Sequence, residues 1–132
     1  MSACTFFGHG DCPSTEKEKL RSAIASACEL GADVFYVGKE GAFDRLAAAV
    51  LEEMGLNYYI VCAYMPKEYI KNSIFPEGQE CVHPRFAIKK RNRWMLGKAD
   101  TVIAYVERTF GGAAEFTALA EKQGKRVINI GK

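Results

Sequence analysis

The chain has 132 residues, of which 48% are hydrophobic, 11% aromatic and 26% charged. Because a domain averages roughly 150 residues, this length excludes a second catalytic module, and we expect one domain over residues 1–132. The net charge is +2 and the pI is about 8.3, below the value above ~9 that is typical of dedicated nucleic-acid-binding domains. Overall charge therefore identifies no partner.

The five cysteines have irregular spacing, without a C-x-x-C pair or a His/Cys cluster at zinc-ligand spacing. We therefore expect no disulfide framework, no metal site and no bound cofactor. No apolar stretch approaches the ~20 residues of a membrane span, and the first apolar run is short and lacks a basic leader. These features predict a cytoplasmic protein with no membrane partner.

Apolar runs typical of strands alternate with amphipathic helical patterns along the whole chain. Alternation of this kind predicts a parallel sheet covered by helices, so the expected fold is α/β, with a three-layer, Rossmann-like, five-stranded parallel sheet and helices on both faces. Thr15 and Glu18 have the spacing of a capping box at the start of the first helix. The expected strands are 3–7, 33–37, 58–63, 101–106 and 127–130, and the expected helices begin near residues 15, 42, 85 and 112.

Residues 64–84 interrupt this rhythm with three prolines, and only residues 67–71 fit a short helical turn. Loops longer than ~12–15 residues in compact domains are usually functional or mobile. We therefore expect this segment to be a lid or a substrate loop.

Glycines gather where three of the predicted strands end. In an open parallel sheet, ligands bind outside the carboxyl ends of the strands, where glycine lets the backbone approach a ligand and the following helix attracts phosphate. The three turns predict one anion-binding crevice, although tight turns alone also use glycine. The expected ligand-binding glycines are Gly8, Gly38, Gly41, Gly111 and Gly112.

Two polar residues accompany these turns. His9 ends the first predicted strand, and Asp44 lies in the first turn of the second predicted helix. Asp44 has two open interpretations, a contact to a ribose hydroxyl or a helix cap. The chain has neither G-x-G-x-x-G after the first strand nor G-x-x-x-x-G-K-[ST], which disfavours a standard NAD-dependent dehydrogenase and a P-loop ATPase.

Three segments together, 41–47, 90–95 and 111–115, resemble the SLOG superfamily. This Rossmann-like group includes YpsA-type proteins, the nucleotide-binding part of the DNA-processing protein DprA, and the Lonely-Guy phosphoribohydrolases. The resemblance covers essentially the whole chain. It is greatest to a small single-domain branch whose members begin with a stretch similar to residues 5–9. It implies a nucleotide-like ligand and a homo-oligomer.

The Lonely-Guy enzymes cleave the N-glycosidic bond of nucleoside 5′-monophosphates. Their R-K-x-x-M arginine corresponds to Arg91, four residues before Met95, and the glutamate that closes P-G-G-x-G-T-x-x-E corresponds to Glu115. The resemblance therefore implies Arg91 and Glu115 as catalytic residues. The departures are Asn92 for lysine, residues 107–109 for the Pro-Gly-Gly approach, and Gly112 for threonine.

Both Arg91 and Glu115 have side chains suited to cleavage of an N-glycosidic bond. A carboxylate stabilises an oxocarbenium-like state or activates water, and an arginine holds a phosphate through paired hydrogen bonds. Glu115 is equally interpreted as a first-turn acid that favours the helix dipole, and Arg91 as one charge of a solvated basic face.

Three functions follow from these observations. The first is binding of a nucleotide or nucleotide-derived small molecule in the crevice, favoured by the altered phosphate loop. The alternative is a nucleoside 5′-monophosphate N-glycosidase that uses Arg91 and Glu115. The second alternative is binding of single-stranded nucleic acid. The resemblance to DprA and the basic helix favour this function, and the modest net charge argues against it.

Overall fold

The structure is a computed structural model, and it describes residues 2–131. The strands are β1 (Ser2–Gly8), β2 (Ala32–Val37), β3 (Tyr58–Val61), β4 (Ser73–Ile74), β5 (Thr101–Tyr105) and β6 (Arg126–Asn129). The helices are α1 (Lys17–Glu29), α2 (Ala42–Glu53), α3 (Ala87–Lys98) and α4 (Gly112–Lys122). Each strand and helix expected from periodicity is present, with ends shifted by a few residues.

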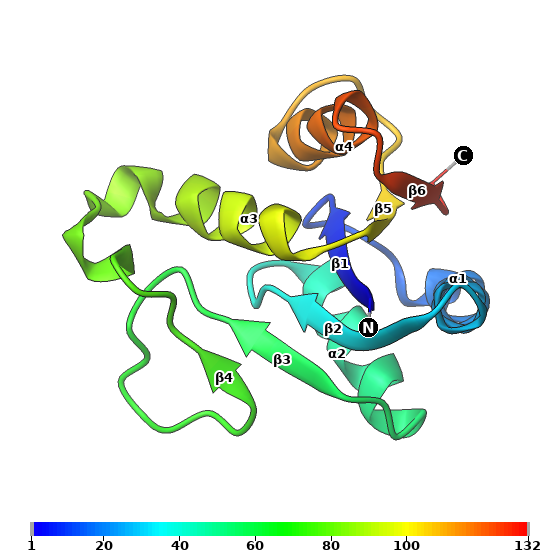
Figure 1. Ribbon diagram of the computed structural model, residues 1–132, viewed down its shortest axis with the longest axis horizontal. Coiled ribbons are helices and arrows are strands. Elements are labelled where there is room, and N and C mark those ends of the chain that lie inside the picture. The colour runs from blue at the N-terminus through cyan, green and yellow to red at the C-terminus, as the bar shows by residue number, and fades with distance from the viewer. Residues whose placement is uncertain (1, 132) are drawn as a thin grey trace.

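The strands form one sheet in the order β4-β3-β2-β1-β5-β6, and every pairing is parallel (Figure 1). The predicted fold class is confirmed, but the sheet has six strands rather than five. The additional strand, β4, comes from the segment expected to be a loop, and pairs Ser73 with Ile60 and Ile74 with Val61. A two-residue strand is too short to show the period-two alternation by which strands are predicted.

Two apolar cores, one on each face of the sheet, create the three layers. Helices α1 and α2 cover one face, where Phe6 and Phe35 are buried among their side chains. Helices α3 and α4 cover the other, where Phe7 packs with Met95 and Phe116. Phe6 and Phe7 are neighbours in β1, and the alternation of a strand sends their rings to opposite faces. All five residues of β5 are buried, as its continuous apolar run predicts.

Helix α1 does not begin with the predicted capping box. A 3-10 turn over Ser14–Glu16 precedes it, and Thr15 lies inside that turn. The turn closes through the backbone N–H of Glu16, which donates to the carbonyl of Pro13 at 3.1 Å. No side chain caps either the turn or α1.

The two ends of the segment 64–84 are bonded to each other, and its Gln79 is bonded to the residue just before the segment and to the start of α3. The predicted helical turn at 67–71 is absent, and a 3-10 turn forms instead at Gln79–Cys81. The Tyr64 hydroxyl donates to the carbonyl of Pro84 at 2.9 Å. The buried Gln79 amide nitrogen donates to the carbonyls of Ala63, at 3.1 Å, and Ala87, at 2.6 Å. The role of this segment as a lid stays a prediction.

The chain reverses its winding direction at the middle of the sheet. Strand β1 has β2 on one side and β5 on the other, so the connections that leave these strands diverge above their carboxyl ends. This divergence creates the crevice in which doubly wound sheets bind ligands. Within residues 2–131, the helices are too short and too polar to cross a membrane.

Candidate functional site

A hollow of about 140 Å³ lies at the carboxyl end of β1, between the starts of α2 and α4 and the inner side of α3. We call it the β1 hollow. Four of the predicted site residues, Gly8, Asp44, Arg91 and Gly112, line it together. The predicted convergence of distant turns is therefore observed for these four positions. Glu40 and Asn92 complete its polar lining.

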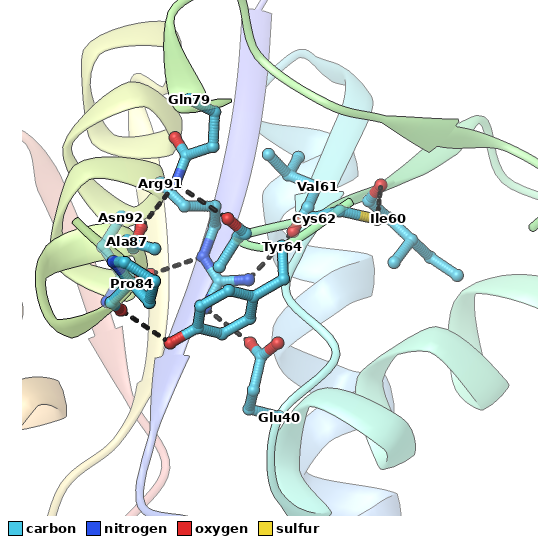
Figure 2. A network of polar contacts seen from close by, with 11 residues as sticks. Glu40, Ile60, Val61, Cys62, Tyr64, Gln79, Pro84, Ala87, Arg91 and Asn92 are labelled. Carbon is cyan, nitrogen blue, oxygen red and sulfur yellow. Dashed lines mark hydrogen bonds and ion pairs between the residues drawn. The ribbon is translucent and has the colours of Figure 1, made fainter. Parts of the chain in front are cut away.

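Arg91 connects three elements around this hollow, and Figure 2 shows its guanidinium between them. Its Nε donates to Asn92 Oδ1 at 2.8 Å, Nη1 to the carbonyl of Val61 at 2.9 Å, and Nη2 to Glu40 Oε1 at 2.7 Å. The side chain is 3% exposed. Within residues 2–131, these bonds use three of the five guanidinium N–H groups, so two are left for a ligand. Arg91 thus fixes α3 to the end of β3 and is almost completely buried.

Gly38 allows this arrangement by having no side chain. A Cβ at this position would lie 2.8 Å from Arg91 Nη1 and 2.8 Å from Asp44 Oδ2. The backbone after β2 therefore packs directly against both charged groups. Gly38 contributes to the site through close approach, not through the lining of the hollow.

Asp44 has an unusual protonation equilibrium. Burial raises its pKa from 3.8 to about 7, Arg91 opposes this shift, and the nearby carboxylate of Glu40 adds to it. Near neutral pH the carboxyl group therefore exists in both forms. A group of this kind both donates to and accepts from a hydroxyl, which is the chemistry expected for a ribose contact.

The N-terminal ends of α2 and α4 differ in whether a ligand can reach them. At α2, a Cβ on Gly41 would lie 2.9 Å from Gly10 Cα, and the N–H of Ala42 donates to the Gly10 carbonyl at 2.9 Å. The turn after β1 therefore covers the N-terminal end of α2 and leaves no room there for a ligand. At α4, the N-cap Gly111 has φ 97° and no side-chain cap, and a Cβ on Gly111 or Gly112 would meet open space. The uncapped start of α4 is the anion-attracting end that faces the β1 hollow.

His9 lies beside the hollow and serves the loop after β5. Its Nε2 accepts from the backbone N–H groups of Glu107, at 3.1 Å, and Arg108, at 3.3 Å. Burial lowers the pKa of His9, and the positive charge of Arg108 adds to this effect. The ring is therefore neutral, with its proton on Nδ1, and it fixes the loop that leads into α4. It does not line the hollow, and a direct ligand contact of His9 stays a prediction.

Glu115 is not in contact with Arg91. Its Oε1 lies 3.4 Å from Lys89 Nζ, its side chain is 50% exposed, and it does not line the β1 hollow. Residue 115 lies two positions after Ala113, about 200° around the helix axis, and so points away when Ala113 faces the hollow. The structure places the two predicted catalytic residues on neighbouring helices without bringing them together.

Sequence reasoning missed Glu40, the ion-pair partner of Arg91. It is separated from Arg91 by 51 residues, and nothing in the local pattern distinguishes it from a solvated turn residue. Its position two residues after Gly38, in a glycine turn at a strand end, is the signal that could have found it. Among residues 2–131, no cluster of three or more His, Cys, Asp or Glu side chains is arranged to hold a metal ion.

Comparison with known proteins shows similarity at the level of the fold. No family model matches the sequence, and no curated protein is detectably similar to it. The structure is similar to that of DNA processing protein A (DprA) from Streptococcus pneumoniae, with a TM-score of 0.71 and 17% identity over 98% of this chain and 50% of that one.

It is also similar to DprA from Helicobacter pylori, a structure described for its mode of binding single-stranded DNA. The TM-score is 0.65 and the identity 16%, over 97% of this chain and 64% of the other. The chain thus spans less than two thirds of either protein. These likenesses agree with the predicted Rossmann-like fold.

Proposed function

We propose that the β1 hollow binds the sugar-phosphate part of a nucleotide. One observation carries this proposal, namely that an uncapped helix start and a buried, charged cluster meet in one glycine-lined hollow above the middle of the sheet. A volume of about 140 Å³ is below the ~300 Å³ of complete ligand pockets. The base therefore extends out of the hollow.

Charge assigns separate roles to the two sides of the hollow. Arg91 is already paired with Glu40 at 2.7 Å, so it adds little net attraction for an anion. The phosphate is instead placed at the backbone N–H groups of Gly112 and Ala113, where the α4 dipole is positive. Asp44 and the remaining N–H groups of Arg91 then face the ribose hydroxyls.

A thermal-shift titration with nucleoside monophosphates and the corresponding nucleosides tests this proposal. A ligand at ~100 times its Kd stabilises the folded state by roughly 2.7 kcal/mol, which raises the melting temperature measurably. We expect this effect for the monophosphates and a much smaller one for the nucleosides.

Gly112→Asp adds a carboxylate where the phosphate is expected, in a helix turn that tolerates acids. We expect it to reduce the shift clearly, whereas Ala49→Asp, which adds the same charge on the exposed side of α2, keeps the full shift. Equal shifts with nucleosides, or an undiminished thermal shift in Gly112→Asp, would contradict the proposal.

A second candidate function is binding of single-stranded DNA. Two exposed aromatic rings each lie beside an arginine, with Arg108 5.6 Å from the centre of Phe110 and Arg85 5.9 Å from the centre of Phe86. The rings are 69% and 55% exposed. Aromatic rings flanked by cations are the elements by which proteins stack bases and hold the backbone of a single strand. The described activity of the H. pylori neighbour supports the same candidate.

The salt dependence of oligonucleotide binding separates the two candidates. A single strand that contacts several cations loses affinity steeply as salt rises, because counterions are released. We expect Phe110→Ala to weaken binding of an oligonucleotide but not of a mononucleotide. Hydrolysis by Arg91 and Glu115 is not proposed, because Glu115 pairs with Lys89 outside the hollow. Release of free base during the same incubations would reinstate it.

A further inference from the structure

A second recess, which we call the α3 groove, lies between α3 and the segment that precedes it. Its volume is about 460 Å³, and it is lined by Gln79, Val82, Phe86, Lys90, Arg93 and Trp94, among others. The β1 hollow uses residues 88, 91, 92 and 95 of the same helix. With 3.6 residues per turn, these two sets lie on different sides of α3. The groove and the hollow share no lining residue and are separate sites.

Two aromatic side chains form walls of the groove. Phe86 is 55% exposed, so its ring is available to a ligand. Trp94 is partly buried, and its indole meets Tyr36 edge to face at 5.3 Å. That contact fixes the indole, and Lys98 Nζ lies over the same ring, 5.3 Å from its centroid. A planar, aromatic ligand is therefore the group that such walls accommodate best.

The polar lining of the groove is positively charged. Lys90 lies across the turn at Gly78, where its Nζ would be 3.7 Å from an added Cβ. Lys90 and Arg93 form no ion pair with another residue of the described chain, whereas Lys17, Lys89 and Arg91 do. Glu77 is the one acidic side chain in this lining. The groove therefore carries a net positive charge beside its aromatic walls.

Gln79 adds a hydrogen-bond acceptor. Both hydrogens of its amide nitrogen are used, at the carbonyls of Ala63 and Ala87; Figure 2 labels Gln79 and Ala87. These bonds fix which end of the amide is oxygen. The side chain is only 2% exposed. Its Oε1 is therefore shielded from water, yet it accepts no hydrogen bond from any group within residues 2–131. A buried acceptor without a partner is unfavourable. Gln79 lines the groove, so a ligand N–H that displaces the cover of this oxygen would supply the bond that the protein lacks.

We propose that the α3 groove is a second nucleotide-binding site, independent of the β1 hollow. The base stacks against Phe86 and Trp94, an exocyclic amino group donates toward Gln79, and the phosphate lies against Lys90 and Arg93. The same chemistry is offered by a free nucleotide and by one nucleotide of a single strand. An acidic peptide would satisfy the two cations but would leave the aromatic walls without a planar partner.

The groove contains its own reporter, because Trp94 is the single tryptophan of the chain. We would titrate the full chain with AMP, with CMP, with a short single-stranded oligonucleotide and with a glutamate-rich peptide, and follow Trp94 fluorescence. A base that stacks on the indole is expected to quench it. Lys90→Gln/Arg93→Gln should weaken this binding about tenfold or more, because two charge-assisted contacts are lost.

Arg45→Gln/Lys122→Gln removes the same charge from exposed positions on α2 and α4, and should bind like the unmodified chain. Phe86→Ala, a second variant at an exposed position, should also weaken the quenching. Similar quenching by mononucleotides and by the oligonucleotide identifies the free nucleotide as the ligand. A much tighter response to the oligonucleotide identifies the single strand.

Several results would overturn the proposal. Absence of quenching by every nucleotide and oligonucleotide would do so, as would equal binding of the glutamate-rich peptide or unchanged affinity in Lys90→Gln/Arg93→Gln. Gly112→Asp distinguishes this outcome from failure of the β1 hollow. It is expected to reduce the thermal shift attributed to the hollow while leaving the quenching of Trp94 intact.

Discussion

Replacement of Arg91 by methionine tests whether this residue fixes α3 to the sheet. Methionine fills much of the same volume without a charge. It removes the hydrogen bonds to Val61, Asn92 and Glu40, which are 2.7–2.9 Å long. The Val61 carbonyl is then left buried without its donor, and Glu40 loses its cation.

The expected loss can be bounded from the surroundings of each partner. Breaking a buried ion pair by removing one member costs about 3–5 kcal/mol. Here the Glu40 side chain is 35% exposed, so water partly compensates its charge and the lower end applies. We therefore expect Arg91→Met to lower the free energy of unfolding by about 3 kcal/mol. For a domain of this size, that corresponds to a fall in Tm of about 12 °C.

Urea unfolding, followed by circular dichroism, measures this quantity directly. Glu40→Gln serves as the matched variant and should cost less than Arg91→Met, about 1–2 kcal/mol, because the amide oxygen can still accept from Arg91 Nη2 while the buried guanidinium loses its charged partner. The double variant should cost less than the sum of the two single changes, since both remove the same contact. A loss below about 1 kcal/mol for Arg91→Met, with an unchanged m-value, would refute the structural role assigned to Arg91.

Three further predictions concern other residues of the site. Because folding raises the pKa of Asp44 from 3.8 to about 7, its contribution to stability is complete below pH ~4 and is lost as pH rises through 7; Asp44→Asn should therefore flatten the loss of stability measured between pH 5 and pH 8. Gly8→Ala places a methyl group into the ring of Phe43 and should cost about 1–3 kcal/mol in urea unfolding; a neutral result would mean that this ring moves freely. His9→Ala leaves two backbone N–H groups of the loop after β5 without their acceptor and should cost about 1–3 kcal/mol. Hydrogen exchange should quicken at those two amides, and unchanged protection would contradict the assignment.

The sequence was sufficient for the fold class and for five of the six strands, because hydrophobic periodicity records which face of each element is buried. The short apolar run of β1 and the continuous apolar run of β5 are local signals, and both led to correct predictions. The two-residue strand β4 carries no such signal, since its existence depends on the backbone of β3. The capping box at Thr15 failed for a related reason, because a 3-10 turn competed with it locally.

The site was predicted in part. Glycines at strand ends indicated that the turns carrying Gly8 and Gly112 meet, and the resemblance to a known family indicated Arg91; the structure places these residues and Asp44 around one hollow. Sequence spacing could not show that Glu115 turns toward Lys89, because the rotation of α4 about its axis is set by tertiary packing. Nor could it distinguish the start of α2 from that of α4, because the N–H of Ala42 at the start of α2 donates to a carbonyl in a distant turn, that of Gly10.

The small strand β4 changes how the two halves of the chain are joined. The first half supplies β1, β2 and β3, and the second supplies β5 and β6 beside β1 but also β4 beside β3. The second half therefore contributes strands on both sides of β1–β3, and α3 connects the segment that contains β4 to β5 (Figure 1). A cut in the exposed stretch around Tyr69, which is 88% exposed, would sever the polypeptide without releasing either piece. This stretch is consequently the natural position for new termini in a circular permutant.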